Sequence, residues 1–152
     1  MDQKDRQLIR VLQKNGRITN QDLAAAVNLS PSPCLRRVKN LEKRGAITGY
    51  SAQIDAEAYG LPVSVFVRVR LERHTEESVR KFEQDVASVA EVMECYVMTG
   101  TFDYLLHVVV ADLSGYENFV RKRLHTVGGI ASIDTSFVYG VVKKTGVFPA
   151  IE

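Results

Sequence analysis

A segment rich in arginine and lysine, "NLSPSPCLRRVKNLEKRGAI" (Asn28–Ile47), carries residue types that bind nucleic acid. Ser30 and Pro31 are typical of a helix start, and Gly45 is typical of a helix end. At about 100° per residue, such a helix has one apolar side and one polar side. The apolar side contains Cys34, Leu35, Val38 and Leu41. The polar side contains Ser32, Arg36, Lys39, Asn40 and Lys43, flanked by Arg37 and Arg44. The basic residues therefore form one coherent face.

Recognition of a DNA groove needs this kind of face. Arginine pairs bidentately with guanine, asparagine pairs with adenine, and serine bonds either a base or a phosphate. We predict that Ser32, Arg36 and Lys39 contact bases or lie next to them. The other predicted DNA-binding residues, several of them phosphate contacts that set affinity without reading sequence, are Thr19, Asn20, Gln21, Ser30, Arg37, Asn40, Lys43 and Arg44. The alternative is a solvated basic face on a small three-helix bundle.

The elements that position this face are three helical patterns in a row. The first begins at Asp5 and ends at Asn15-Gly16. The second begins after Thr19, which resembles the first residue of a capping box with Asp22. Only "NLS" separates the second helix from the basic one. Two short helices joined by such a turn are typical of a helix-turn-helix, whose second helix enters the major groove of DNA.

The charge distribution supports a division of labour along the 152-residue chain. Residues 1–50 hold 10 Lys and Arg against 4 Asp and Glu, whereas residues 51–152 hold 10 against 14. A basic N-terminal part joined to an acidic remainder suggests a polyanion as partner of the first part. Gly60 and Pro62 punctuate the connector. We therefore expect a helix-turn-helix domain with a strand linker at residues 1–60, and a second domain at residues 61–152.

Several other classes of protein are disfavoured by the sequence. No apolar run is long enough for a membrane span, and the charged N-terminus has no signal-peptide core. Cys34 and Cys95 lack the spacing of metal ligands, so we expect a reduced cytoplasmic protein with no metal and no cofactor, and buried apolar roles for both cysteines. His74, His107 and His125 are isolated, and no catalytic constellation accompanies them. We do not expect an enzyme.

After the linker, whose segment "AITGYSAQID" suggests short strand pieces, the order of elements is β-α-β-β-α-β. "VSVFVRVRL" (Val63–Leu71) alternates strictly between apolar and other residues. The predicted strands that follow are "VMECYVMT", "YLLHVVVA" and "IASIDTSFVYGVV"; the predicted helices begin at Thr75 and at a capping box, Ser114 to Glu117. This α+β order predicts a ferredoxin-like fold, an antiparallel sheet with both helices on one face. The open face is apolar enough to favour self-association.

The loop "GTFDY" (Gly100–Tyr104) joins the second and third predicted strands. Gly100 permits a left-handed backbone, and a tight loop exposes N–H groups beside the Asp103 carboxylate. Such a loop suits a zwitterion, with N–H groups toward a carboxylate and Asp103 toward an ammonium. Thr99 is a further candidate to line the pocket, and Met98-Thr99 otherwise suggests sheet packing. The alternative is an ordinary hairpin in which Asp103 bonds its own backbone.

"LSPSPCLRRVKNLEKRGAITGY" followed by "GTFDYLL" resembles the Lrp/AsnC family, the leucine-responsive and feast/famine transcription regulators. The resemblance extends from the helix at Asp5 to the tail "KKTGVFP". It implies a DNA-binding domain that engages double-stranded DNA and an effector domain that assembles into dimers and often into octamers. It also implies that a free amino acid, the small-molecule effector, lies at the contact between dimers. An architectural DNA-binding protein that senses no effector remains the alternative.

The resemblance places the effector near the loop, with the start of the last strand opposite. The effector residues that we predict are Met98, Thr99, Gly100, Thr101, Asp103 and Tyr104 on the loop side, and Ala131, Ser132, Ile133, Asp134 and Thr135 on the opposite wall. Ala131 and Ile133 offer no polar side chain. If they point into the pocket, an effector with a polar side chain is disfavoured.

Overall fold

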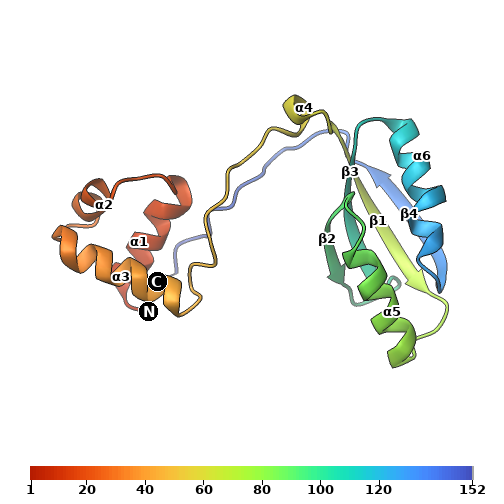
Figure 1. Ribbon diagram of the computed structural model, residues 1–152, viewed down its shortest axis with the longest axis horizontal. Helices are drawn as coiled ribbons and strands as arrows, with labels where there is room; N and C mark the ends of the chain where they lie inside the picture. The colour runs from red at the N-terminus through yellow and green to blue at the C-terminus, as the bar shows by residue number, and fades with distance from the viewer. Residues whose placement is uncertain (152) are drawn as a thin grey trace. The chain divides into compact units, whose positions relative to one another are not determined.

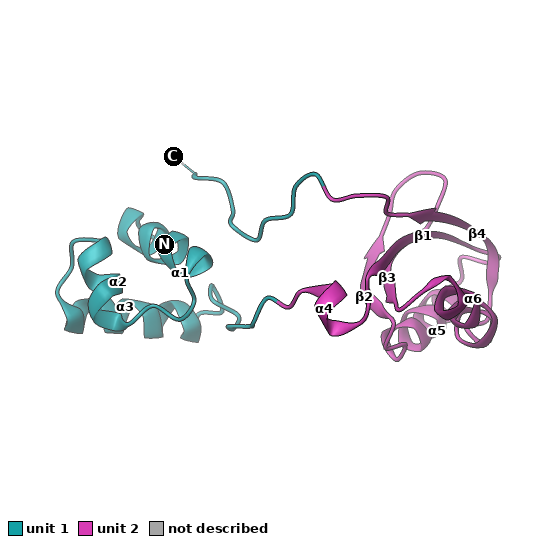
Figure 2. Ribbon diagram, turned by 90° about the horizontal axis from the view of Figure 1, so that it is seen from above, with its two compact units in different colours: residues 1–53, 142–152 teal, residues 54–141 magenta. Residues whose placement is uncertain are grey.

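The computed structural model describes residues 1–151, which form two compact units. The first unit comprises residues 1–53 and the C-terminal segment from Val142, and the second comprises Ile54–Val141 (Figures 1 and 2). The C-terminal segment groups with the first unit because Gln13 Nε2 donates to the Gly146 carbonyl at 3.0 Å and Arg6 donates to the Ile151 carbonyl at 3.3 Å. The sequence placed this segment in the second domain.

The first unit contains three helices, α1 (Gln3–Lys14), α2 (Asn20–Ala26) and α3 (Pro31–Lys43). Their apolar sides meet in a small core. Its buried members are Leu8, Leu23, Ala24, Val27, Cys34 and Leu41. Because each helix buries only one stripe, the outer sides of α2 and α3 stay in solvent, as a helix-turn-helix requires.

Local chemistry sets the ends of α2 and α3. Thr19 caps α2 through its side chain, as predicted. The connecting turn places Asn28 at φ 53°, a left-handed conformation that asparagine tolerates better than most residues. Gly45, at φ 70°, ends α3: its N–H bonds the Glu42 carbonyl and the Ala46 N–H bonds the Leu41 carbonyl, which is a Schellman motif. The basic helix therefore begins and ends where the sequence indicates.

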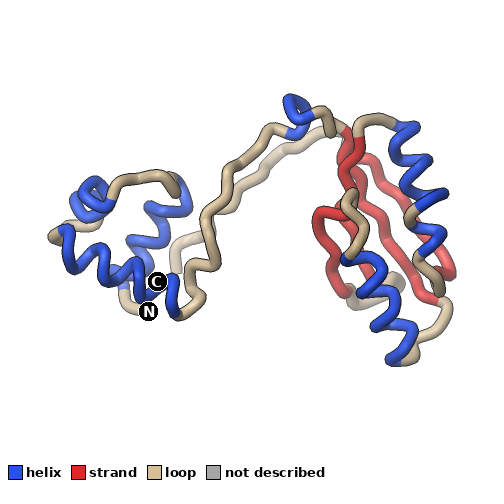
Figure 3. Tube along the Cα trace, viewed as in Figure 1, coloured by secondary structure: helices blue, strands red, loops and turns tan. Residues whose placement is uncertain are grey.

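The second unit is an antiparallel four-stranded sheet in the order β2-β3-β1-β4 (Figure 3). The strands are β1 (Val63–Leu71), β2 (Val92–Val97), β3 (Tyr104–Val110) and β4 (Ile130–Phe137). Helices α5 (Glu76–Ala87) and α6 (Leu113–Lys122) lie on one face of the sheet (Figure 2). A short α4 (Ala56–Tyr59) precedes β1, and a 3-10 turn, η1 (Leu124–Thr126), follows α6. This arrangement confirms the predicted ferredoxin-like α+β fold.

The alternation of β1 sorts its side chains as predicted. Val65, Val67, Val69 and Leu71 are buried under the two helices, together with Phe82 of α5 and Phe119 of α6. The residues between them, such as Phe66 and Arg68, lie on the open face. Burial of the alternate residues fixes the register of the strand, because a shift by one residue would expose the whole apolar set.

Several local predictions were wrong. Residues 46–55 form no strand, because no described strand lies beside them to complete a ladder (Figure 3). Helix α6 begins two residues earlier than predicted, because Asp112, and not Ser114, is the cap and accepts the Gly115 N–H at 2.7 Å. Strand β4 ends at Phe137, which pairs with Val65 near the start of β1. The predicted strand to Val142 is therefore too long.

Two burial predictions also failed. Leu35 is 43% exposed, because the stripe of α3 that α1 and α2 cover is narrow and centres on Cys34 and Leu41. Cys95 is exposed, because neither α5 nor α6 covers most of the edge strand β2, whereas Cys34 is buried as expected. Both cysteines are free.

Candidate functional site

The outer side of α3 is the first candidate site. The exposed residues there are Ser30, Ser32, Arg36, Lys39, Asn40, Lys43 and Arg44. Within residues 1–151, no hydrogen bond or ion pair engages the side chains of Arg36, Lys39, Lys43 and Arg44. Unpaired cations on one exposed helix side are available to an external polyanion.

The start of α2, a predicted DNA contact, also has partners within the first unit. Thr19 Oγ1 accepts the Asp22 N–H at 3.1 Å and lies 2.7 Å from Asp22 Oδ2, so it serves as the helix cap. Asn20 Nδ2 donates to the Pro31 carbonyl at 2.9 Å, which joins the start of α2 to the start of α3. Gln21 is exposed. Thr19 and Asn20 thus stabilise the helix-turn-helix through bonds within it.

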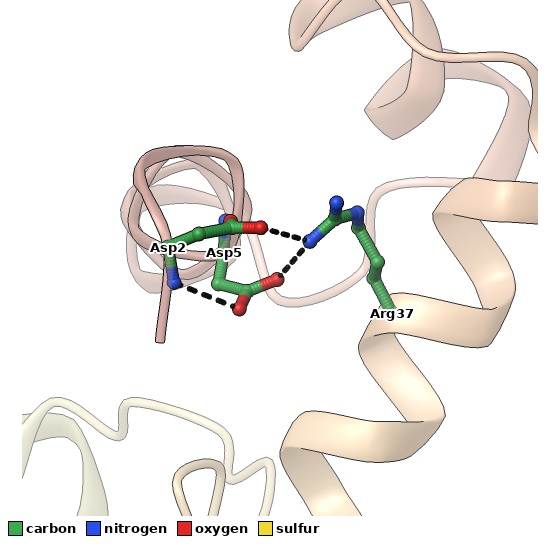
Figure 4. Close-up of polar contacts among 3 residues, drawn as sticks. All are labelled: Asp2, Asp5 and Arg37. Atoms are coloured by element: carbon green, nitrogen blue, oxygen red, sulfur yellow. Dashed lines mark hydrogen bonds and ion pairs between the residues drawn. The ribbon is translucent and has the colours of Figure 1, made fainter.

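Arg37, a predicted phosphate contact, has internal partners as well. It is only partly exposed, and its guanidinium contacts the carboxylates of both Asp2 and Asp5 at the start of α1 through one nitrogen, Nη1 (Figure 4). Of the residues predicted to hold phosphate on α3, Lys43 and Arg44 remain exposed and unpaired within the described chain.

The loop between β2 and β3 is the second candidate site. Gly100 takes φ 111°, a left-handed conformation that favours glycine. The Met98 N–H bonds the Asp103 carbonyl at 2.8 Å, and the Asp103 N–H bonds the Val69 carbonyl at 2.9 Å. The loop is therefore held firmly to the end of β1.

The Asp103 carboxylate does not bond its own backbone; each of its oxygens has a partner on another residue. Its Oδ2 accepts the backbone N–H of Leu71 at 2.8 Å, and its Oδ1 lies 2.9 Å from His74 Nε2. The Leu71 N–H is the main cause that holds the pKa of Asp103 below its usual value, and His74 adds to the effect. The Asp103 carboxylate therefore links the loop between β2 and β3 to the end of β1 and to His74.

Tyr104 is a core residue that also borders the hollow beside the loop. Its side chain is 3% exposed, packs against Phe82 with ring centroids 4.5 Å apart, and donates its hydroxyl to Glu83 Oε1 at 2.9 Å. Burial, with the Glu83 carboxylate, raises the pKa of Tyr104 strongly. This side chain anchors the loop to α5.

Two hollows lie near the predicted effector residues. The larger has a volume of about 620 Å³ on the open face of the sheet, and it is lined by Phe66, Arg68, Met98, Thr99, Thr101, Phe102, Tyr104, Leu105 and Ser136. The smaller, of about 300 Å³, lies by η1, and its lining includes His125, Gly129, Ala131, Ser132 and Ile133. Seven of the predicted residues are thus divided between two hollows of one chain, and neither hollow includes Gly100, Asp103, Asp134 or Thr135.

The remaining residues of β4 have internal partners. Asp134 pairs with Arg68 Nη1 at 2.5 Å on the open face. Thr135 Oγ1 lies 2.5 Å from the Tyr116 hydroxyl on the helix face. Alternation along β4 therefore sends the predicted wall residues to opposite faces of the sheet.

Sequence reasoning missed Leu71, His74 and Arg68 as neighbours of the loop. Leu71 contributes only a backbone N–H, which leaves no trace in the residue type. Arg68 meets Asp134 through the pairing of β1 with β4, which the ferredoxin-like order implies. His74 lies beyond β1, and no sequence pattern pointed to its contact with Asp103.

Neither a metal centre nor a membrane segment is evident in the described part of the chain. Within residues 1–151, His, Cys, Asp and Glu side chains form no group of three or more that could hold a metal ion. No helix in the same range has the length and apolar character that a membrane crossing demands.

The fold and the two sites define a class: a DNA-binding regulator with an N-terminal helix-turn-helix and a C-terminal ligand-binding domain. Residues 1–48 match the family model of the winged helix-turn-helix DNA-binding domain, and residues 64–148 match that of the Lrp/AsnC ligand binding domain. The chain belongs to the Lrp/AsnC family of transcription regulators.

Individual relatives agree with this assignment. The chain is 41% identical over 137 residues to the Bkd operon transcriptional regulator of Pseudomonas aeruginosa, covering 90% of each chain. It is 38% identical over 145 residues to the leucine-responsive regulatory protein of Haemophilus influenzae, covering 95% of this chain and 87% of that one.

A solved structure of a transcriptional regulator from Neisseria meningitidis in complex with L-Met superposes with a TM-score of 0.93. Its sequence is 37% identical, with 98% of this chain and 96% of that chain covered. An AsnC family regulator from Agrobacterium tumefaciens is similar at a TM-score of 0.93 and 35% identity, with 98% and 97% covered. These relatives are regulators and not enzymes, which confirms that this chain is a regulator as well.

Proposed function

We propose that this protein is a sequence-specific transcription regulator that responds to a free amino acid and acts as an assembly of dimers. The observation that carries the proposal is the exposed, unpaired basic side of α3 on a chain whose second unit is an amino-acid-type ligand domain. Two copies of α3 in a dimer would engage half-sites about one helical turn apart.

The residues of α3 divide into two roles. Ser32, Arg36 and Lys39 lie on the exposed side and have the donors and acceptors that recognise base edges. Lys43 and Arg44, at the end of the helix, are exposed cations suited to phosphates, which position the protein without reading sequence.

Matched variants separate these roles. Arg36→Ala is expected to cost about 1–3 kcal/mol on a specific duplex and much less on a random one. Arg44→Ala is expected to weaken both duplexes alike and to lower the slope of log Kd against log salt by about 1. Fluorescence anisotropy with both duplexes over a salt series measures both effects. Equal losses of Arg36→Ala on specific and random DNA would remove its reading role.

The effector that fits best is an amino acid with an apolar side chain. The hollow of about 620 Å³ is bordered by apolar side chains, among them Phe66, Met98 and Leu105, and by loop residues Thr99 and Thr101. The Neisseria relative was solved with L-Met, which supports an effector of this class here. A zwitterion at the loop would use backbone N–H groups for its carboxylate, and its ammonium would have to displace His74 to reach Asp103.

Calorimetric titration with the twenty amino acids tests this part of the proposal. We expect binding of one or a few apolar amino acids, and no binding of Asp or Glu. Effector binding shifts DNA affinity only by the difference in effector affinity between assembly states. The same titrations are therefore repeated in the presence of a duplex.

Self-association is proposed to use the open face of the sheet. Phe66 and Leu105 lie there only partly covered, and Tyr96 is 48% exposed, so the face has apolar area to bury. Light scattering of Phe66→Glu is expected to show a smaller assembly than the unmodified chain, since a carboxylate cannot be buried unpaired. Thr126→Glu, an exposed position outside the sheet, is the control.

The second candidate is an architectural regulator that assembles and wraps DNA without an effector. It shares every feature except a working ligand site. The bonds from Leu71 and His74 to the Asp103 carboxylate favour this second candidate, because they leave the carboxylate less free to bind a ligand. Twenty blank titrations with intact DNA binding would select this candidate.

A further inference from the structure

Arg37 is the exception on the basic helix. Among the Lys and Arg residues of α3 in the described chain, it alone forms ion pairs. Its Nη1 lies 2.7 Å from Asp2 Oδ2 and 2.7 Å from Asp5 Oδ1 (Figure 4). One nitrogen therefore directs its two N–H groups to two carboxylates, and the two acceptors belong to the start of α1.

The two carboxylates are themselves fixed. Asp2 Oδ1 accepts the Asp5 N–H at 2.8 Å, and Asp5 Oδ2 accepts the Asp2 N–H at 3.1 Å, which is a reciprocal capping box. Each carboxylate thus uses one oxygen for the cap of α1 and the other for Arg37. The Asp5 N–H and the Arg37 guanidinium hold the pKa of Asp2 below its usual value. Asp5 is buried at 9% exposure, so its position is also set by packing.

The bonds of Arg37 restrict the orientation of α3 in a way that apolar packing does not. Leu8 and Cys34 pack α1 against α3, but apolar contacts tolerate rotation and sliding of a helix. Hydrogen bonds from one planar guanidinium to two oxygens require a particular orientation. The cluster of Asp2, Asp5 and Arg37 therefore fixes the rotation of α3 about its axis, and with it the direction of the exposed basic side.

The charge balance argues against a phosphate contact at this position. Two carboxylates pair with one guanidinium, so the cluster carries a net negative charge. The salt dependence of DNA binding counts cations that neutralise phosphates and release counterions. A guanidinium already neutralised from inside contributes little to that count, whereas Arg44 contributes fully.

We propose that Arg37 is a positioning residue for DNA recognition: it orients α3 through Asp2 and Asp5 so that Ser32, Arg36 and Lys39 face the groove, and it holds no phosphate. The inference depends on DNA binding by this family and not on the identity of an effector.

The first test compares Arg37→Met with Arg44→Met in the full-length protein. Anisotropy titrations use a specific and a random duplex over a salt series, at a temperature where circular dichroism shows both variants folded. Arg37→Met is expected to lose about tenfold or more in specific affinity with an unchanged salt slope. Arg44→Met is expected to lower the slope by about 1. A slope that falls equally in both variants would overturn the proposal.

The second test removes the carboxylates and keeps the arginine. Asp2→Asn and the double variant Asp2→Asn/Asp5→Asn make the DNA-binding unit more positive, so electrostatics alone would strengthen binding to every duplex. Positioning predicts the opposite sign for specific DNA: weaker specific binding and stronger random binding, hence a lower specificity ratio. If both affinities rise together, Arg37 is a restrained phosphate contact and the proposal is wrong. Asp2 is exposed, so its single variant remains informative if the double variant fails to fold.

Discussion

Replacing Asp103 with alanine removes the two side-chain contacts that connect the loop between β2 and β3 to Leu71, the last residue of β1, and to His74. The Leu71 N–H, in a residue that is 3% exposed, loses its acceptor at 2.8 Å. His74 loses its partner at 2.9 Å. The backbone bonds of Met98 and Asp103 remain, so the loop is weakened at one end and not released.

The size of the effect follows from these two contacts. A hydrogen bond from a buried N–H to a charged group contributes about 1.5–3 kcal/mol, and leaving the N–H unpaired accounts for most of that loss. The His74 pair is 64% exposed on the imidazole side, and an exposed pair contributes at most about 1 kcal/mol. The second unit should therefore lose about 2–3 kcal/mol of unfolding free energy. For a unit of this size, that corresponds to a melting transition about 10–20 °C lower.

Asp103→Asn is the matched control. Its side-chain carbonyl can still accept the Leu71 N–H, so only the charge and part of the His74 contact are lost. Unfolding is followed by circular dichroism with hydrogen exchange of the Leu71 amide, because the two units of the chain need not unfold together. We expect the amide to be protected in the unmodified chain and in Asp103→Asn, and to exchange faster in Asp103→Ala.

Two results would refute this reasoning. One is an Asp103→Ala protein as stable as the Asp103→Asn protein, since the carboxylate would then contribute no structural hydrogen bond. The other is unchanged protection of the Leu71 amide in Asp103→Ala. In either case Asp103 would be free to serve as a ligand group only, and the loop would owe its shape to the backbone bonds.

Three further predictions follow from burial and pKa. The pKa of Asp103 lies below its usual 3.8, so the stability that its carboxylate adds to the fold is complete above pH 3.8 and is lost as the pH falls through the lowered pKa. In acid titrations, the unfolding free energies of the unmodified chain and Asp103→Asn should therefore converge below that lowered pKa. Leu8→Ala empties a fully buried position in the first unit, so urea titration should show a loss of about 2–5 kcal/mol there and an unaffected second unit. Tyr104→Phe removes only the bond to Glu83, so the unfolding free energy of the second unit, measured by thermal melting, should fall by about 1 kcal/mol. DNA affinity should not change.

Local features of the sequence determined much of the fold. Thr19 and Thr75 cap helices where the capping pattern placed them, and Gly45 ends α3. The alternation of β1 assigned its buried face, and the order of elements identified the ferredoxin-like unit. These features are legible because caps, turns and alternation act between residues close together in the chain, where residue type alone sets the geometry. The basic side of α3 was predictable for the same reason, since helical period decides which residues share a side.

Tertiary structure alone decided which polar groups are already engaged. Arg37 and Arg44 have the same side chain on the same helix, yet Asp2 and Asp5 engage one and leave the other exposed. Asp103 could have bonded its own backbone or a ligand, and it bonds the N–H of Leu71, a donor that every residue type except proline possesses. Such partners come from distant parts of the chain and are selected by packing, so neither residue type nor spacing specifies them.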